Sequence, residues 1–111
     1  MHIDEERHGD VLILRPVGRI DSATARAFEA RLLDAVEPGP SRLVVDLGAL
    51  TLMTEAGLRA LLTAARRAKP AGSRVVLAAP PPAARARLAA SGLSSLFECH
   101  DSVPAAVAAL S

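Results

Sequence analysis

Short apolar runs bounded by turn residues predict buried strands in this chain. The strongest runs are residues 11–17, 42–47 and 74–79. A weaker candidate at residues 3–8 is joined to the first strong run by the turn pair Gly9-Asp10, which predicts an antiparallel hairpin. Residues 96–99 predict a short final strand.

Other stretches repeat apolar residues every three or four positions, which is the period of an amphipathic helix. Helices are predicted over residues 23–36, from Thr54 or Glu55 to about residue 68, over residues 82–90, and from residues 101–104 onward. Residues 18–22 are expected to break the first strong strand, and Asp21 or Ser22 to cap the helix that follows. Residues 38–40 and 69–72 are expected to end the first two helices, and Gly92 the third.

The predicted order of elements is β-β-α-β-α-β-α-β-α. Alternation of strands and helices indicates a mostly parallel sheet with right-handed crossovers, and the hairpin adds one antiparallel strand. The fold class is therefore α/β with about four helices. Residues 1–111 are predicted to form one domain, because no linker, repeat or low-complexity tract divides them.

Loops at the carboxyl ends of parallel strands share one edge of a sheet. Residues 18–22, 50–56 and 79–82 are therefore expected to lie close together. The central one lies between a buried strand and the N-terminus of a helix, where backbone N–H groups and the positive end of the helix dipole meet. This geometry suits an anion, a phosphate or a partner protein, and the residues alone do not choose among them.

The composition limits the classes of function that the protein can have. The net charge is +1 and Phe28 and Phe97 are the only aromatic residues, so neither a basic surface nor stacking platforms for nucleic acid are predicted. The single cysteine, Cys99, cannot form an internal disulfide. No apolar run approaches the ~20 residues that span a bilayer, and the charged N-terminus does not look like a signal peptide, so a cytoplasmic protein without membrane insertion is expected.

Chemistry at the predicted edge is limited. The three histidines have no metal-site spacing, and no cofactor motif is present. Asp21 and Glu55 are two carboxylates without a histidine or serine nucleophile beside them, so the protein is not expected to be an enzyme. Met53 has two readings, as a core residue under the helix or as an adaptable partner contact.

The pattern Gly-x-Ile-Asp at residues 18–21, together with Val-Val-Asp-Leu and Gly-Leu between residues 44 and 58, resembles the STAS family. This family includes anti-sigma-factor antagonists, which bind by protein–protein contact in partner-switching control of transcription. The resemblance implies a STAS-like fold over essentially the whole chain. It also implies a partner-binding edge formed by Asp21, Ser22, Met53, Thr54, Glu55, Ala56, Gly57, Leu58 and Arg59.

In antagonists of this family a serine or threonine in that motif is phosphorylated by a GHKL-type serine kinase that doubles as the anti-sigma factor. The matching position here is Glu55, with Thr54 before it and Gly57-Leu58-Arg59 after it. Glu55 therefore cannot be phosphorylated. Its single negative charge partly imitates a phosphate that carries about −1.5 to −2. Thr54 remains a candidate for a displaced phosphoacceptor.

Glu55 and Thr54 also have purely structural interpretations. Glu55 suits the first turn of a helix because of the dipole, and Thr54 suits an N-cap. The resemblance also leaves a second function open, a stand-alone STAS subunit attached to a lipid or anion transporter through an ATPase subunit. Self-association into a homodimer is a further property that the resemblance allows.

Overall fold

The computed structural model describes residues 1–92 and 96–111 of the chain, and six strands and four helices lie within them. The strands are β1 His2–His8, β2 Val11–Ile20, β3 Arg42–Asp46, β4 Leu50–Met53, β5 Arg74–Ala78 and β6 Glu98–His100. The helices are α1 Ala25–Val36, α2 Glu55–Ala71, α3 Pro82–Ala90 and α4 Val103–Leu110. None of these helices is long and apolar enough to cross a membrane.

The strands form one mixed sheet in the order β1-β2-β3-β5-β6, and β4 pairs with β2 outside this path. β1 and β2 are antiparallel, with His8 opposite Val11 around the predicted turn, and every other pairing is parallel. The predicted α/β class, N-terminal hairpin and four helices are thus confirmed.

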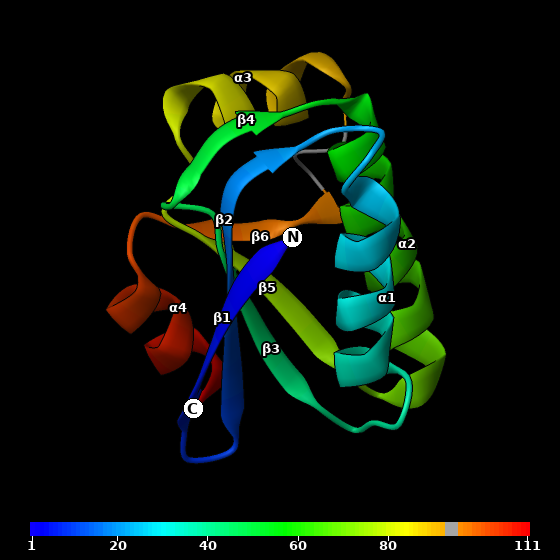
Figure 1. Ribbon diagram of the computed structural model, residues 1–111. Coiled ribbons are helices and arrows are strands. Elements are labelled where there is room, and N and C mark those ends of the chain that lie inside the picture. Colours follow the sequence, from blue (N-terminus) through cyan, green and yellow to red (C-terminus); the bar gives the residue numbers. More distant parts are fainter. Residues whose placement is uncertain (93–95) are drawn as a thin grey trace.

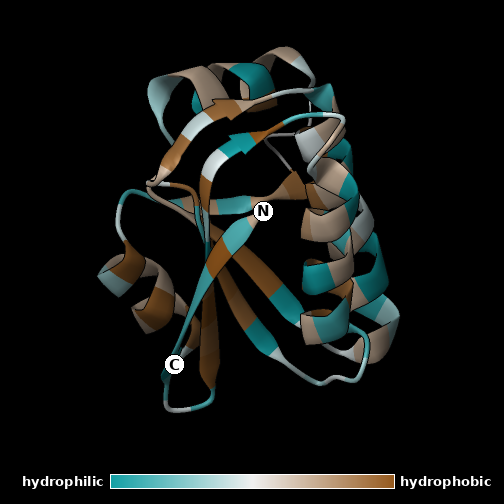
Figure 2. Ribbon diagram, viewed as in Figure 1, coloured by the Kyte–Doolittle hydropathy of each residue, from teal (hydrophilic) through white to brown (hydrophobic). Residues whose placement is uncertain are grey.

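The two faces of the sheet are covered unequally (Figure 1). Helices α1 and α2 lie side by side over one face, α4 lies over the other, and α3 crosses the end of the sheet next to β4. The face under α1 and α2 carries the larger apolar cluster, which includes Leu14, Leu43, Phe28 and Leu61, all fully buried. Figure 2 shows a second contrast, between the centre and the edge of the sheet, since β3 and β5 are mainly hydrophobic where they run through the middle of the molecule and β1 at the edge is hydrophilic.

β4 is the element that the sequence pattern did not predict. Residues 50–53 were expected to be loop, but they form a short strand parallel to the last residues of β2, with Gly18 opposite Leu50 and Ile20 opposite Met53. The pairing exists because β2 is longer than expected. It continues through Gly18, whose φ of +94° favours glycine, and the register shifts between Gly18 and Arg19. Gly18 therefore marks a bulge and not the end of the strand.

Helix boundaries differ from expectation at two places. α1 begins at Ala25 and not at Ala23, because a turn held by Asp21 precedes it. α2 extends to Ala71, about three residues beyond the expected last helical residue 68, and ends within the predicted stop at residues 69–72, with Pro70 in its last turn. The helix is closed by Gly72, which is left-handed with φ +72°. Gly72 N–H bonds the Lys69 carbonyl and Ser73 N–H bonds the Ala68 carbonyl, which is the Schellman arrangement.

The remaining elements follow the predictions closely. α3 occupies residues 82–90, and Gly92 with φ +75° follows it. β6 begins at Glu98 and extends to His100, two residues later than expected at its start. In α4, Leu110 is buried, and Val103 and Val107 pack partly buried against the smaller apolar cluster.

Candidate functional site at the end of strand β2

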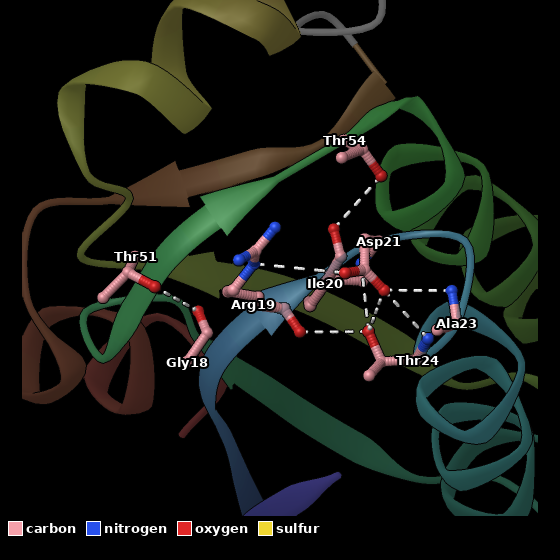
Figure 3. Close-up of polar contacts among 8 residues, drawn as sticks. All are labelled: Gly18, Arg19, Ile20, Asp21, Ala23, Thr24, Thr51 and Thr54. Atoms are coloured by element: carbon pink, nitrogen blue, oxygen red, sulfur yellow. Dashed lines mark hydrogen bonds and ion pairs between the residues drawn. The ribbon is translucent and has the colours of Figure 1, made fainter.

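Three consecutive backbone carbonyls at the end of β2 each accept a hydrogen bond from a threonine hydroxyl (Figure 3). Thr51 of β4 donates to Gly18 O at 3.1 Å, Thr24 donates to Arg19 O at 3.0 Å, and Thr54 donates to Ile20 O at 3.1 Å. We call these residues the threonine triplet. They join the end of β2 to β4, to the start of α1 and to the start of α2, and so fix the relative positions of two of the three loops expected to cluster.

Asp21 holds the turn that leads into α1. Its Oδ1 accepts hydrogen bonds from Ala23 N at 2.9 Å and Thr24 N at 3.2 Å, and Thr24 Oγ1 accepts from Asp21 N at 3.0 Å. This exchange between Asp21 and Thr24 is a capping box. The backbone N–H groups, Ala23 first, hold the pKa of Asp21 below its usual value, and Arg19 at 4.0 Å contributes to the same effect. Asp21 thus caps the turn that precedes α1, as expected of a residue before this helix, but the N-cap residue of α1 itself is Thr24, which makes no side-chain cap hydrogen bond.

The start of α2 is built differently. Thr54 stands at the N-cap position with extended backbone angles, but its side chain caps no N–H of its own helix. Both its hydroxyl and its backbone N–H donate to Ile20 O instead, the latter at 3.0 Å. The expectation that Thr54 is an ordinary N-cap is wrong in this respect. The hydroxyl is used for a tertiary contact, and Thr54 is only partly exposed.

Glu55 points into solvent at the first turn of α2. Its side chain is 77% exposed, and the nearest cation is Arg59 one turn later, whose guanidinium lies 3.8 Å from the carboxylate. The distance is long and the Arg59 side chain is itself 76% exposed, so this pair contributes little to stability. The position where the resemblance places the phosphoacceptor therefore carries an accessible negative charge at the positive end of a helix dipole.

Gly57 allows α2 to lie close against β2 and β4. A β-carbon at this position would stand 2.7 Å from Ile20 Cγ2 and 2.9 Å from Met53 Cγ. Gly57 is helical, so the requirement for glycine comes from this close approach and not from backbone conformation. Met53 is 5% exposed, which agrees with the reading that placed it under the helix.

The predicted edge residues divide into three groups by exposure. Ser22, Glu55 and Arg59 are exposed, and Asp21, Thr54 and Ala56 are partly exposed. Met53, Gly57 and Leu58 are buried and support the surface from beneath. The nine residues lie together where β2, β4 and α2 meet, but only the first two groups reach the surface.

The third predicted loop, residues 79–82, leads into α3 at the same end of the sheet. Between α2 and α3 lies a shallow hollow of about 430 Å³, lined by Glu55, Leu58, Ala83, Ala86, Arg87, Ala90 and Ser91. The α3 residues of this hollow, and the exposed residues Thr51 and Leu52 of β4, are not among those that the sequence predicts for the edge. The prolines at residues 80–82 predicted where α3 begins. The hydrophobic pattern of α3 did not indicate which element it would pack against.

The chemistry available here is that of a contact surface. Within residues 1–92 and 96–111, no cluster of three or more histidine, cysteine or acidic side chains could hold a metal ion. The Asp21 carboxylate is occupied by the capping box and the triplet hydroxyls are bonded to carbonyls. The edge presents the exposed charges of Glu55 and Arg59 to other molecules. The backbone that carries them is held in place by the threonine triplet and by the close contact at Gly57.

Comparison with known proteins assigns this α/β domain to a family. A family model described as the STAS domain matches residues 2–106. The chain belongs to the STAS family. It is 34% identical over 109 residues to BtrV, a candidate anti-sigma factor antagonist of Bordetella bronchiseptica, covering 98% of this chain and 94% of BtrV.

Solved structures support the same assignment. An anti-sigma factor antagonist from Mycobacterium paratuberculosis is 27% identical with a TM-score of 0.87, over 97% of this chain and 92% of that one. The antagonist SpoIIAA in its unphosphorylated form has a TM-score of 0.81 at 19% identity, over 98% and 96% of the two chains, which shows the shared fold. The protein is thus a STAS domain like those of anti-sigma factor antagonists.

Proposed function

We propose that this protein is a non-enzymatic, cytoplasmic regulator that binds an anti-sigma factor through the edge formed by Asp21, Ser22, Thr54, Glu55, Ala56 and Arg59. The observation that carries the proposal is the 34% identity to BtrV over nearly the full length of both chains. The expected partner is a GHKL-type serine kinase that acts as the anti-sigma factor, as the family resemblance implies.

The architecture of the edge supports binding. A surface that recognises a partner works best when it is preorganised, because less conformational entropy is lost on association. The threonine triplet and the close contact at Gly57 hold the loop before α2 on rigid elements. Exposed charges such as Glu55 and Arg59 then set orientation and specificity more than raw affinity.

The regulatory part of the proposal concerns position 55. Glu55 carries a permanent charge, so partner affinity is constitutive and is not switched by phosphorylation at this position. The tertiary hydrogen bond of the Thr54 hydroxyl supports the same view, because a kinase would have to break the bond to Ile20 O before it could use this oxygen. Thr54 is therefore not a displaced phosphoacceptor in the proposal.

A pull-down from lysate of the source cells tests the partner, with captured proteins identified by mass spectrometry. Wild type and Glu55→Ser are compared with Glu37→Ser. Glu37 is the matched control because it is also exposed and ion-paired with an arginine, Arg67 at 3.1 Å, but follows the far end of α1. Capture of an anti-sigma factor by wild type and by Glu37→Ser is expected. Capture of transporter ATPase subunits in its place would overturn the proposal.

A phosphorylation assay with the captured kinase and ATP tests the switch. Wild type is expected to accept no phosphate, whereas Glu55→Ser is expected to be modified at residue 55. Phosphate found on Thr54 of the wild type would refute constitutive binding. If only Glu55→Ser captures the kinase, Glu55 imitates the phosphorylated state and the wild type is held in its unbound form, which also contradicts constitutive binding.

A further inference from the structure

The partner-binding edge carries exposed charge but little exposed apolar surface. Charges such as Glu55 and Arg59 set the orientation and rate of association more than its affinity. Affinity comes mainly from a few side chains that a partner removes from water near the centre of an interface. The large apolar residues of the edge, Met53 and Leu58, are only 5% and 4% exposed, so a partner would bury little more of them. A tight complex therefore needs an apolar anchor beside the edge.

Few large apolar side chains are exposed in the part of the chain that the structure describes, and two of them lie next to the edge. The exposed ones are Met1 at 44%, Val17 at 39%, Leu52 at 37% and Leu96 at 57%. Leu52 belongs to β4, two residues before Thr54. Val17 belongs to β2, two residues before the residue that pairs with Leu52.

Strand register places Val17 and Leu52 on the same face of the sheet. Ile20 pairs with Met53, and both are buried, whereas Arg19 pairs with Leu52 one residue earlier. Because side chains alternate along a strand, Arg19 and Leu52 point to the outer face, and so does Val17. The aliphatic stem of Arg19, whose side chain is 67% exposed, adds apolar surface next to both. We call Val17, Arg19 and Leu52 the β2–β4 ridge.

The helices leave the ridge open to solvent. On this face of the sheet α4 packs against β3, β5 and β6, and α1 and α2 lie on the other face (Figure 1). Val11 and Ile13, on the same side of β2 as Val17, are buried in the apolar cluster under α4, but Val17 lies beyond that cluster. Exposed apolar surface that is bordered by polar residues is typical of a protein–protein contact.

The ridge is held firmly and is continuous with the edge. The Thr51 hydroxyl donates to Gly18 O at 3.1 Å, which fastens β4 to β2 directly beside Leu52. On the other strand, Arg19 Nε lies 4.0 Å from Asp21 Oδ2, so the ridge meets the edge at this ion pair (Figure 3). An anchor on paired strands loses little conformational entropy when it binds.

We propose that the β2–β4 ridge is the apolar anchor of the anti-sigma-factor complex, with Leu52 entering an apolar pocket of the partner. The inference rests on the proposed function, because ridge and edge form one contact surface. The ridge sets the lifetime of the complex, and the charges of Glu55 and Arg59 act mainly on the rate of its formation.

Binding kinetics on the immobilised anti-sigma factor from the pull-down test the ridge. Leu52→Thr is the test variant, since threonine suits a strand but removes most of the apolar side chain. Leu96→Thr is the control, because Leu96 is more exposed and precedes β6, which β3 and β5 separate from β2. Leu52→Thr is expected to bind roughly tenfold more weakly through faster dissociation, and Leu96→Thr to bind as the wild type does.

Val17→Thr is a second test that keeps the shape of the side chain. It replaces one methyl group by a hydroxyl, so a smaller loss of affinity, roughly threefold, is expected. Urea denaturation of the three variants reports whether each is folded under the binding conditions. If Leu52→Thr does not fold, Val17→Thr still decides the outcome.

The possible failures of the ridge and of the proposed function are distinguishable. If the wild type binds the anti-sigma factor and folded ridge variants bind equally well, the ridge is refuted and the proposed function stands. Equal weakening by Leu52→Thr and Leu96→Thr would mean non-specific apolar contact and would also refute it. Slower association of Leu52→Thr with unchanged dissociation would contradict its role as an anchor. If the wild type captures no anti-sigma factor, the proposed function fails and the ridge fails with it.

Discussion

Two helices start within a few residues of the end of β2, and they start in different ways. α1 is preceded by the Asp21–Thr24 capping box, in which side chains satisfy backbone N–H groups of the opening turn. α2 has no side-chain cap, and its N-cap threonine bonds to Ile20 O in the neighbouring strand. Both N-cap threonines, Thr24 and Thr54, donate their hydroxyl to a carbonyl of β2. Only the α1 start has in addition a carboxylate, that of Asp21, bonded to backbone N–H groups of the turn before the helix.

This difference between the two helix N-termini also determines which carboxylate is free to contact another molecule. The carboxylate of Asp21 already contacts four groups, the N–H of Ala23, the N–H and hydroxyl of Thr24, and the Arg19 guanidinium. At α2 the equivalent negative group, Glu55, is exposed and bonds no backbone N–H. At the α1 start the Asp21 carboxylate stabilises the turn. At the α2 start the backbone is held by contacts with β2, and the Glu55 carboxylate remains exposed to solvent.

Gly57→Ala should lower the free energy of unfolding most, because it disturbs the close packing of the first turn of α2 against β2 and β4. The added methyl group would collide with Ile20 and Met53, both buried. Overpacking costs about 1–3 kcal/mol, partly offset by the helix propensity of alanine, so a net loss of about 1–2 kcal/mol in the free energy of unfolding is expected. Urea denaturation measures it.

Gly48→Ala is the control for Gly57→Ala. Its β-carbon would come no closer than 3.1 Å to any atom, and its backbone is not left-handed. It should destabilise the protein less. If Gly57→Ala is as stable as the wild type, α2 can shift away from β2 and the α2 start is not rigid.

Asp21→Asn should weaken the α1 start in a pH-dependent way. The pKa of Asp21 is lowered in the folded protein, so its ionised form adds stability above the unfolded pKa of about 3.9. That contribution is lost as pH falls through the folded pKa. The stability difference between wild type and Asp21→Asn should therefore be largest at neutral pH and shrink below about pH 4.

Thermal unfolding between pH 2 and pH 7 measures the Asp21 effect. Asp34→Asn removes the same charge from an exposed position that makes no side-chain hydrogen bond among the described residues, and it corrects for net charge. A difference that stays constant with pH would show that the Asp21 charge does not stabilise the turn.

Thr54→Val should cost less than Gly57→Ala. Valine keeps the shape and removes the hydroxyl, but Ile20 O still receives the Thr54 backbone N–H at 3.0 Å and is not left unpaired. A loss of about 0.5–1.5 kcal/mol is expected from urea denaturation, and Thr54→Ser should keep most of the stability. Equal stability of Thr54→Val and the wild type would mean that the hydroxyl bond to Ile20 carries no weight.

The order of strands and helices could be predicted from the sequence, because the spacing of hydrophobic residues along each segment determines which of the two it forms. The apolar runs at residues 11–17 and 42–47 predicted strands, and Asp21 before an amphipathic stretch indicated a cap. These features depend on neighbours in the chain. The same local logic placed Glu55 in the first turn of a helix, but it left Met53 with two readings, of which the structure shows the buried one.

Features that depend on distant residues escaped prediction. The four residues of β4 become a strand only because β2 continues past a bulge at Gly18, and a short run with the burial order buried-exposed-exposed-buried shows no alternation. The Thr54 hydroxyl turns away from its own helix because Ile20 O lies within reach. Residues 69–72 were expected to end α2, and they do, but the exact last residue depends on the Schellman closure at Gly72 and Ser73, which keeps Pro70 inside the helix.

Glu55→Gln should have the smallest effect on stability and so sharpens the contrast between the two helix starts most directly. The substitution removes the charge but keeps the size of the side chain, which is 77% exposed and 3.8 Å from Arg59. An exposed ion pair and a screened dipole interaction together predict a change of less than about 1 kcal/mol, and one that diminishes at high salt. Urea denaturation at low and high salt measures both. A larger loss would mean that Glu55 stabilises α2 as Asp21 stabilises α1. A small loss would mean that its charge is free to act on a partner, since the α2 start remains folded without it.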